Sequence, residues 1–207
     1  MLEKRKFFID GAWTDPKEGQ DHEVIDPSTE EPCAVISLGG QADTDAAVAA
    51  ARAAFEPWAF TPKEERIAAV RRFYDIYKKR AEDMAQAISL EMGAPIEMSR
   101  QSQVGAGIGH TKAFLTVYEE FEHERMLGEH APDDRILYEP IGVVGMITPW
   151  NWPMNQVTLK VAPALAVGCT MVLKPSEIAP LSSALFAEIA DAADLPPGVF
   201  NMVQGDG

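Results

Sequence analysis

Three residues that could bind a ligand follow apolar segments near the end of the chain. Asn151 follows the apolar run 143–147, and Lys174 and Glu177 follow the apolar run 169–173. An amide, an ammonium group and a carboxylate together suit a polar ligand, and a lysine beside a carboxylate suits the hydroxyls of a ribose. A plainer interpretation of Lys174 and Glu177 is a solvated loop with an acidic side chain near a helix N-terminus. The residues alone leave both interpretations open.

A parallel sheet would bring these residues together. The apolar runs 143–147, 169–173 and 199–203 predict three buried strands, and helical patterns at 155–167 and 181–193 separate them. The resulting β-α-β-α-β order implies parallel strands with right-handed crossovers, so the predicted fold class is α/β. Ligands of such sheets bind beyond the carboxyl ends of the strands. The segments expected to share that edge are 148–151, 174–177 and 204–207.

The first 140 residues combine strand and helix patterns. The strongest local signals are the hairpin turn Asp10-Gly11 and the Thr61–Glu64 capping box, which includes Pro62. The expected elements are strands at 7–9, 12–13, 33–36 and 135–139, helices starting at Asp43 or Thr44, at 61–64 and near Glu97, helix ends at Gly93 and Glu124, and a polar break at 128–134.

Charge and composition exclude several classes of partner. The 18 Lys and Arg residues against 32 Asp and Glu give a net charge of −14. Such an acidic surface repels phosphate backbones and anionic lipids, so we expect neither a nucleic-acid nor a membrane partner. The longest apolar stretch, 161–173, is too short to cross a bilayer. Cys33 and Cys169 form no metal-binding spacing, so we expect no metal site and a cytoplasmic location.

The segment 105–110, with the sequence GAGIGH, imitates a dinucleotide-binding fingerprint. His110 stands where the last glycine belongs, and a helical pattern rather than a strand precedes the segment. We therefore expect its small residues to allow close packing between helices.

Longer motifs over the whole chain resemble the aldehyde dehydrogenase superfamily. The motifs are FIDGAW at 8–13, DPST at 26–29, ITPWNWP at 147–153, Lys160, PALAVGCT at 163–170, LKPSE at 173–177 and PPGVFNMVQGDG at 196–207. The resemblance implies N-terminal helices and strands followed by the first half of a Rossmann-like sheet. It also implies NAD-dependent oxidation of an aldehyde to a carboxylic acid through a cysteine thiohemiacetal.

The resemblance assigns roles to matching positions. Asn151 matches the asparagine whose amide donates to the thiohemiacetal oxyanion, and Lys160 matches a lysine implicated in structuring the site and relaying protons; a plain helix-face lysine is the alternative. Lys174 and Glu177 match the pair that holds the adenosine ribose. A carboxylate there repels a 2′-phosphate, which favours NAD over NADP. The other implied cofactor contacts are Ile147, Thr148, Pro149, Trp150, Ser176 and Gly207.

The family's catalytic cysteine and its general base lie downstream of these motifs, whereas this sequence ends at Gly207. Cys33 and Cys169 are expected to be small core residues and not to replace the nucleophile. We therefore expect the N-terminal portion of an aldehyde dehydrogenase that is inactive alone. The alternative is a non-catalytic, truncated remnant that binds nucleotide weakly or only self-associates.

The resemblance also predicts how the chain is divided. Residues 1–121 would form the N-terminal part of the cofactor-binding domain, 122–140 an oligomerisation hairpin segment, and 141–207 the first half of the NAD-binding sheet, with the catalytic domain absent. The implied partners are a small-molecule aldehyde and further copies of the chain in a dimer or tetramer.

Overall fold

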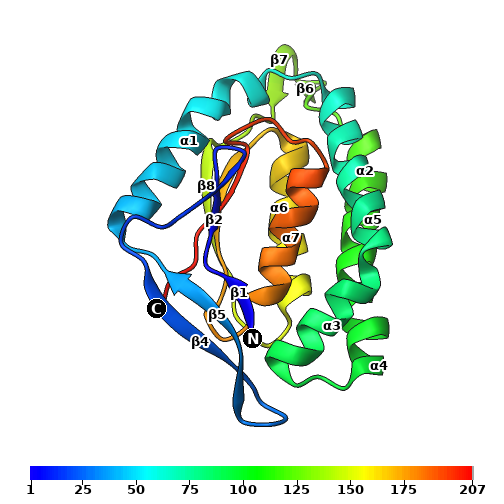
Figure 1. Ribbon diagram of the computed structural model, residues 1–207. Helices are drawn as coiled ribbons and strands as arrows, with labels where there is room; N and C mark the ends of the chain where they lie inside the picture. Colours follow the sequence, from blue (N-terminus) through cyan, green and yellow to red (C-terminus); the bar gives the residue numbers. More distant parts are fainter. Residues whose placement is uncertain (207) are drawn as a thin grey trace.

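A five-stranded mixed sheet forms the centre of the structure, a computed structural model that describes residues 1–206 (Figure 1). Its strand order is β3-β2-β10-β9-β8. The parallel strands β8 (Val143–Ile147), β9 (Thr170–Lys174) and β10 (Phe200–Met202) lie where the sequence predicts them, with β9 in the middle. The predicted α/β class and β-α-β-α-β order are therefore confirmed.

The strands β2 (Phe7–Ile9) and β3 (Ala12–Thr14) extend this sheet on its β10 side, and β2 pairs with β10 in the antiparallel sense. The predicted turn joins them, with φ angles of 54° at Asp10 and 73° at Gly11. Two positive φ angles in a two-residue loop match the right-handed twist of the hairpin. The Asn201 side chain accepts a hydrogen bond from the Asp10 amide (2.9 Å), so β10 fixes this turn.

Helices cover both faces of the sheet. α1 (Gln41–Ala59) packs on one face, and α6 (Pro153–Val167) and α7 (Leu181–Ala192) pack on the other. α2 (Lys63–Lys79) and α5 (Val104–Glu120) form an outer layer against α6. The remaining helical segments are α3 (Ala81–Met92), α4 (Ile96–Met98) and a π-helix (Ser99–Gln103). No helix within residues 1–206 is long and apolar enough to cross a membrane.

A second, three-stranded sheet lies beside the first, with the order β1-β5-β4. The predicted strand at 33–36 is the buried part of β5 (Glu31–Leu38). β1 (Leu2–Lys4) and β4 (Gln20–Asp26) were not predicted. β4 is largely polar and exposed, so it lacks the apolar alternation that identifies a half-buried strand.

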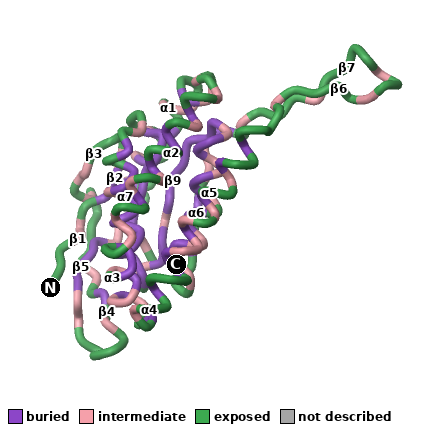
Figure 2. Tube along the Cα trace, turned by 90° about the vertical axis from the view of Figure 1, so that its right-hand side faces the viewer, coloured by how far each residue is buried: buried purple, intermediate pink, exposed green. Residues whose placement is uncertain are grey.

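β6 (Glu124–Gly128) and β7 (Ala131–Leu137) form an antiparallel hairpin that projects from the body of the molecule (Figure 2). The predicted helix end at Glu124 is wrong, because α5 ends at Glu120. The predicted polar break at 128–134 is also wrong, since β7 occupies much of it. Most residues of this hairpin are exposed, so polar sequence here marks a solvated hairpin rather than a break.

Two predicted helix starts form differently. The Thr61 hydroxyl donates to the Pro57 carbonyl of α1 (2.9 Å), so the predicted capping box at 61–64 does not form. At α1, the Asp43 carboxylate caps the helix from its first turn by accepting from the Gly40 amide (3.1 Å). Both differences arise because a side-chain oxygen has several backbone partners within reach at a helix end.

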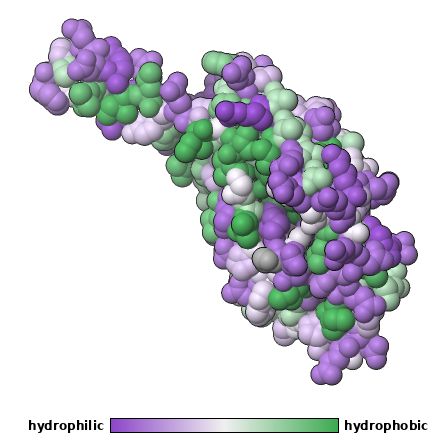
Figure 3. Space-filling model, turned by 90° about the vertical axis from the view of Figure 1, so that its left-hand side faces the viewer, coloured by the Kyte–Doolittle hydropathy of each residue, from purple (hydrophilic) through white to green (hydrophobic). Residues whose placement is uncertain are grey.

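β8 is an edge strand, and its predicted burial is wrong for this reason. Met146 is buried, whereas Ile147 is 74% exposed, and Ile141 just before the strand is 90% exposed. Among residues 1–206, β8 pairs with β9 alone, so its other side is open in this part of the chain. Figure 3 shows hydrophobic side chains gathered beside the base of the hairpin. An open edge with apolar side chains is a surface that another chain can cover.

Aromatic side chains fill the core between the sheet and the outer helices. The ring centroid of Phe186 on α7 lies 4.7 Å from that of Phe73 on α2 and 5.8 Å from that of Phe200 on β10. On α5, a Cβ added to Gly107 would lie 2.5 Å from the Tyr77 hydroxyl oxygen. The glycine-rich segment therefore allows close helix packing at Gly107, as predicted.

Glu91 on α3 is a buried carboxylate at the N-terminus of α7. Its side chain is 1% exposed and accepts hydrogen bonds from the backbone amides of Leu181 and Ser182. Burial disfavours the charged form and raises the pKa of Glu91 from 4.5 to about 7, although the hydrogen bonds oppose the shift. The folded protein therefore holds this proton more tightly than the unfolded chain.

This shift predicts a pH-dependent free energy of unfolding. The contribution of Glu91 should be complete below pH 4.5 and lost as the pH rises through 7, a loss of about 3 kcal/mol. Glu91→Gln keeps an accepting oxygen and cannot ionise. It should therefore remove this part of the dependence of the free energy of unfolding on pH. Urea unfolding at pH 5 and pH 8 measures the difference. If the free energy of unfolding changed equally between pH 5 and pH 8 in the parent and in Glu91→Gln, Glu91 would not be the source of the pH dependence.

Candidate functional site

The carboxyl ends of the three parallel strands meet at one edge, as predicted. The Thr148 amide donates to the Lys174 carbonyl (3.2 Å), and the Val203 amide donates to the Leu173 carbonyl (3.0 Å). These bonds continue the strand pairing into the loops. The described segments that lie at this edge are 148–151, 174–177 and 204–206.

Lys174 connects two of these loops. Its ammonium group donates to the carbonyls of Gly205 (2.7 Å) and Asp206 (2.8 Å) in the loop after β10. The Glu177 carboxylate lies 3.7 Å from the same nitrogen, and both side chains are about a quarter exposed (21% and 27%). One ammonium group with three donors is therefore held between two carbonyls and a carboxylate at the rim of the sheet.

The turn after β9 shapes the carboxylate side of this pair. The Ile178 amide donates to the Ser176 hydroxyl oxygen (3.2 Å), a local bond that closes the turn. The Ser176 hydroxyl lies 3.5 Å from a carboxylate oxygen of Glu177, as a donor would. Ser176, Glu177 and Lys174 thus form one polar group, as the motif predicts.

The segment after β8 offers an apolar surface next to this group. Thr148 is buried at 3% exposure, whereas Ile147, Pro149 and Trp150 are exposed, Trp150 at 46%. The remaining residue predicted to contact a cofactor, Gly207, lies outside the described residues. The described members thus belong to a segment whose backbone lies beside Lys174, since Ile147 pairs with Lys174 and the Thr148 amide donates to its carbonyl.

Asn151 is exposed and lies between β8 and α6, where the chain turns into the helix. Pro153 starts α6, because its fixed φ and missing amide hydrogen suit the first helical position. Lys160 lies further along α6, half-buried, and its ammonium group bonds to the carbonyl (3.4 Å) and side-chain oxygen (3.3 Å) of Gln156. The structure therefore places Asn151 at the edge and ties Lys160 to its own helix.

Gln204 is a further residue at this edge to which the sequence analysis assigned no role. It is 2% exposed, and within residues 1–206 neither atom of its side-chain amide has a hydrogen-bond partner. It directly precedes Gly205, whose carbonyl accepts from Lys174. A buried amide of this kind has a donor and an acceptor to offer, but glutamine at the end of a strand carries no sequence signal.

Neither cysteine lies at this edge. Cys33 is on β5, where its thiol donates to the Val24 carbonyl (3.3 Å), and burial raises its pKa. Cys169 is buried at the opposite, amino end of β9. Within the described residues no group of three His, Cys, Asp or Glu side chains is placed to hold a metal ion.

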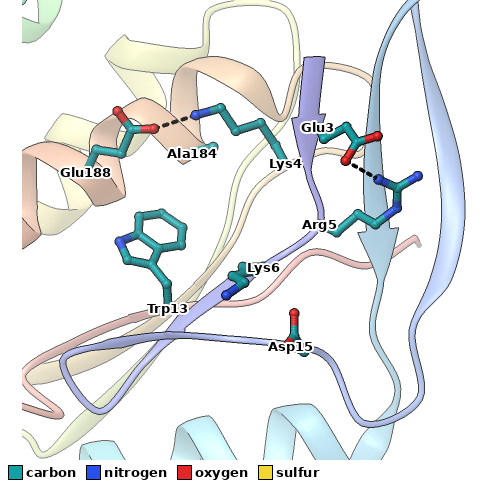
Figure 4. Close-up of a pocket in the computed structure, with 8 residues that line it drawn as sticks. All are labelled: Glu3, Lys4, Arg5, Lys6, Trp13, Asp15, Ala184 and Glu188. Carbon is teal, nitrogen blue, oxygen red and sulfur yellow. Dashed lines mark hydrogen bonds and ion pairs between the residues drawn. The ribbon is translucent and has the colours of Figure 1, made fainter. Parts of the chain in front are cut away.

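A cavity of about 370 Å³ lies away from these residues, between the N-terminal strands and α7 (Figure 4). Its lining includes Trp13 and the ion pair between Lys4 and Glu188 (2.6 Å). None of the candidate residues that the structure describes contributes to it. The carboxyl edge of the sheet, with its convergent polar groups, is therefore the candidate site.

Comparison with known proteins assigns the chain to a family. The profile of the "Aldehyde dehydrogenase family" matches residues 13–207. A 3-succinoylsemialdehyde-pyridine dehydrogenase from a Pseudomonas species is 47% identical over the whole chain, which spans 43% of that protein. A putative aldehyde dehydrogenase from Staphylococcus aureus is 40% identical with the same coverage. The chain thus spans less than half the length of these relatives.

Solved structures agree in fold. An aldehyde dehydrogenase from Bartonella henselae is 57% identical with a TM-score of 0.98, and the match covers 100% of this chain and 44% of that one. An aldehyde dehydrogenase from Pseudomonas syringae, solved with NAD+ and octanal, is 47% identical with a TM-score of 0.94 and coverages of 98% and 41%. Because the family profile covers almost the whole chain and solved members share its fold, the chain belongs to the aldehyde dehydrogenase family.

Proposed function

We propose that this chain supplies the oxyanion donor and the cofactor-ribose site of an NAD-dependent aldehyde dehydrogenase, which oxidises an aldehyde to a carboxylic acid. The observation that carries the proposal is the Lys174–Glu177 pair at the carboxyl edge of the sheet, beside the segment that bears Asn151. NAD+ in the Pseudomonas syringae structure supports the choice of cofactor.

The residues fit a ribose. Lys174 uses two of its three N–H donors on backbone carbonyls, which leaves one donor beside the Glu177 carboxylate. Each hydroxyl of a vicinal diol can accept from an ammonium group and donate to a carboxylate. A 2′-phosphate would meet the Glu177 carboxylate and be repelled, so we propose NAD in preference to NADP.

Two groups of this chain would act during the reaction. The Asn151 amide would donate to the aldehyde oxygen as negative charge develops on it, because a fixed dipole stabilises that charge without reorganising. Lys160 is the candidate for moving a proton away from the site, once its ammonium group leaves Gln156. The cofactor, when bound, accepts the hydride. The thiol nucleophile is neither Cys33 nor Cys169, since both lie away from Asn151.

Titration of the 207-residue chain with NAD tests the proposed cofactor site. We expect saturable binding that is tighter than for NADP. Glu177→Ala should weaken it about 10- to 100-fold, the cost of one hydrogen bond to a charged group. Glu129→Ala, at the exposed tip of the hairpin, is the matched control and should leave the affinity unchanged. Equal affinity for NAD and NADP would contradict the role of Glu177.

The 207 residues alone should form no NADH from an aldehyde and NAD, because the proposed nucleophile is not among them. A chimera in which they replace the corresponding part of the Bartonella henselae enzyme should turn over. Sustained turnover by the 207-residue chain alone would overturn this expectation. Absence of both turnover and NAD binding would favour a non-catalytic remnant that only self-associates.

We also propose an aldehyde as substrate partner and a homo-oligomer, dimer or tetramer, as the assembly. The projecting hairpin β6–β7 carries exposed apolar side chains, among them Met126 at 53% and Leu137 at 59%, which another copy could cover. Two cysteines without a disulfide suit the reducing cytoplasm, which we propose as the location. The division into 1–121, 122–140 and 141–207 remains part of this proposal.

A further inference from the structure

A hydrogen bond joins α5 to α6 next to the segment that carries Asn151. The Nε2 atom of His110 on α5 lies 2.7 Å from the side-chain oxygen Oδ1 of Asn155 on α6. The amide oxygen can only accept, so His110 carries its hydrogen on Nε2 and donates it. Asn155 lies four residues after Asn151, in the first turn of α6.

In the described part of the chain, no side chain caps the start of α6. Trp152 is its N-cap residue and offers no side-chain oxygen, and Pro153 follows at the first helical position. Asn155 is the third helical residue, the position from which a side chain often reaches back to accept from the N-cap amide. Its side-chain oxygen instead accepts from His110, and it makes no bond to the N-cap amide within the described residues. The bond to His110 therefore holds the Asn155 side chain turned toward α5 and away from the cap.

The N-cap amide belongs to the peptide bond between Asn151 and Trp152. If Asn155 were released, its oxygen could accept from that amide and draw the peptide toward the axis of α6. The opposite side of the first turn is already fixed, because Pro153 and Met154 are buried. The His110–Asn155 bond thus acts on the part of this turn that is not buried, since Asn151 is exposed and Asn155 is half-buried.

We propose that His110 is a positioning residue, which holds Asn155 away from the helix cap and thereby fixes the peptide that carries Asn151. The inference rests on the proposed function, in which the Asn151 amide donates to the aldehyde oxygen. The Asn151 side chain must be held in place to donate effectively, since a displaced donor loses most of its effect on the developing charge.

The test compares variants of the ¹⁵N-labelled 207-residue chain by NMR. His110→Leu removes the donor and should shift the resonances of the Asn151 side-chain amide and the Trp152 backbone amide. His110→Gln offers a donor at a similar reach and should restore them. Asn155→Ala removes the acceptor and should give the same shifts at Asn151 and Trp152 as His110→Leu. This second variant keeps the test valid if His110→Leu does not fold.

His130→Leu, at the exposed tip of the hairpin, is the matched control and should change neither resonance. Unshifted Asn151 and Trp152 resonances in Asn155→Ala, or no rescue by His110→Gln, would overturn the proposal. Shifts spread evenly over α5 and α6 would also overturn it, since they indicate general loosening. These spectra do not depend on whether Asn151 acts in catalysis. A negative result would therefore contradict the positioning role of His110 and leave the proposed function untouched.

A kinetic readout links the position of Asn151 to the reaction. In the chimera, His110→Leu should lower kcat roughly fivefold, the effect of one neutral hydrogen bond. In an Asn151→Ala background it should lower kcat no further, because its route of action is already removed. An equal loss in both backgrounds would contradict an action through Asn151.

Discussion

Replacing Asn151 with alanine should lower kcat for aldehyde oxidation by the chimera about 10²- to 10³-fold. The physical reason is the loss of a donor aimed at the oxygen on which negative charge develops, a loss equivalent to about 3–4 kcal/mol in the transition state. The affinity for NAD should change little, because the ribose pair lies on the loop after β9. Steady-state kinetics together with an NAD titration measure both quantities.

Two comparisons make this result specific. Gln101→Ala changes an exposed side chain in the π-helix between α4 and α5 and should leave kcat unchanged. Asn151→Ala should also leave the urea midpoint near that of the parent, since Asn151 is exposed. A kcat within threefold of the parent would show that the amide has no role at the oxyanion.

Replacing Phe186 with alanine should lower the free energy of unfolding by about 3–5 kcal/mol. Phe186 is 1% exposed and touches the aromatic rings of Phe73 and Phe200, so the change removes buried area and leaves a cavity between α2, α7 and β10. Urea unfolding of the 207-residue chain measures the difference. Native domains have about 5–15 kcal/mol to lose, so the variant should lose a large share of its stability.

Phe60→Ala is the control with the same chemical change. Phe60 is 85% exposed at the end of α1, and its replacement should alter the free energy of unfolding by less than about 0.5 kcal/mol. Similar losses for the two variants would mean that Phe60 is covered in solution, for instance by another copy of the chain.

The last third of the fold could be predicted from sequence because its strands are continuous apolar runs. β9 is buried on both faces, and its run from Cys169 to Leu173 needs no knowledge of its neighbours to be recognised. β4 fails the same test, since its polar residues form a strand only because β5 is available to pair with it. Burial was predicted wrongly for β8 because an apolar run does not reveal which strand lies at an edge.

In the candidate site, too, contacts within a short motif could be predicted from sequence, whereas contacts between distant residues could not. Lys174 ends β9 and Glu177 follows three residues later, so a local motif sufficed to predict their pairing. His110 and Asn155 are 45 residues apart, and no pattern in the sequence relates them. The bond of Lys160 to Gln156 depends on side-chain rotamers within α6, which a helical pattern does not specify.

The hairpin formed by β2 and β3 cannot join its sheet when it is made, because its partner strand comes much later in the sequence. Phe8 pairs with Met202, about 190 residues further along the chain. At a synthesis rate of about 5–20 residues per second, the hairpin waits roughly 10 to 40 s for β10 to leave the ribosome. During that time Phe7 and Phe8, which end up buried, are exposed to solvent. Exposed aromatic side chains are what chaperones bind, so we expect this stretch of synthesis to be the one in which the nascent chain needs them, and we expect the central sheet to close late.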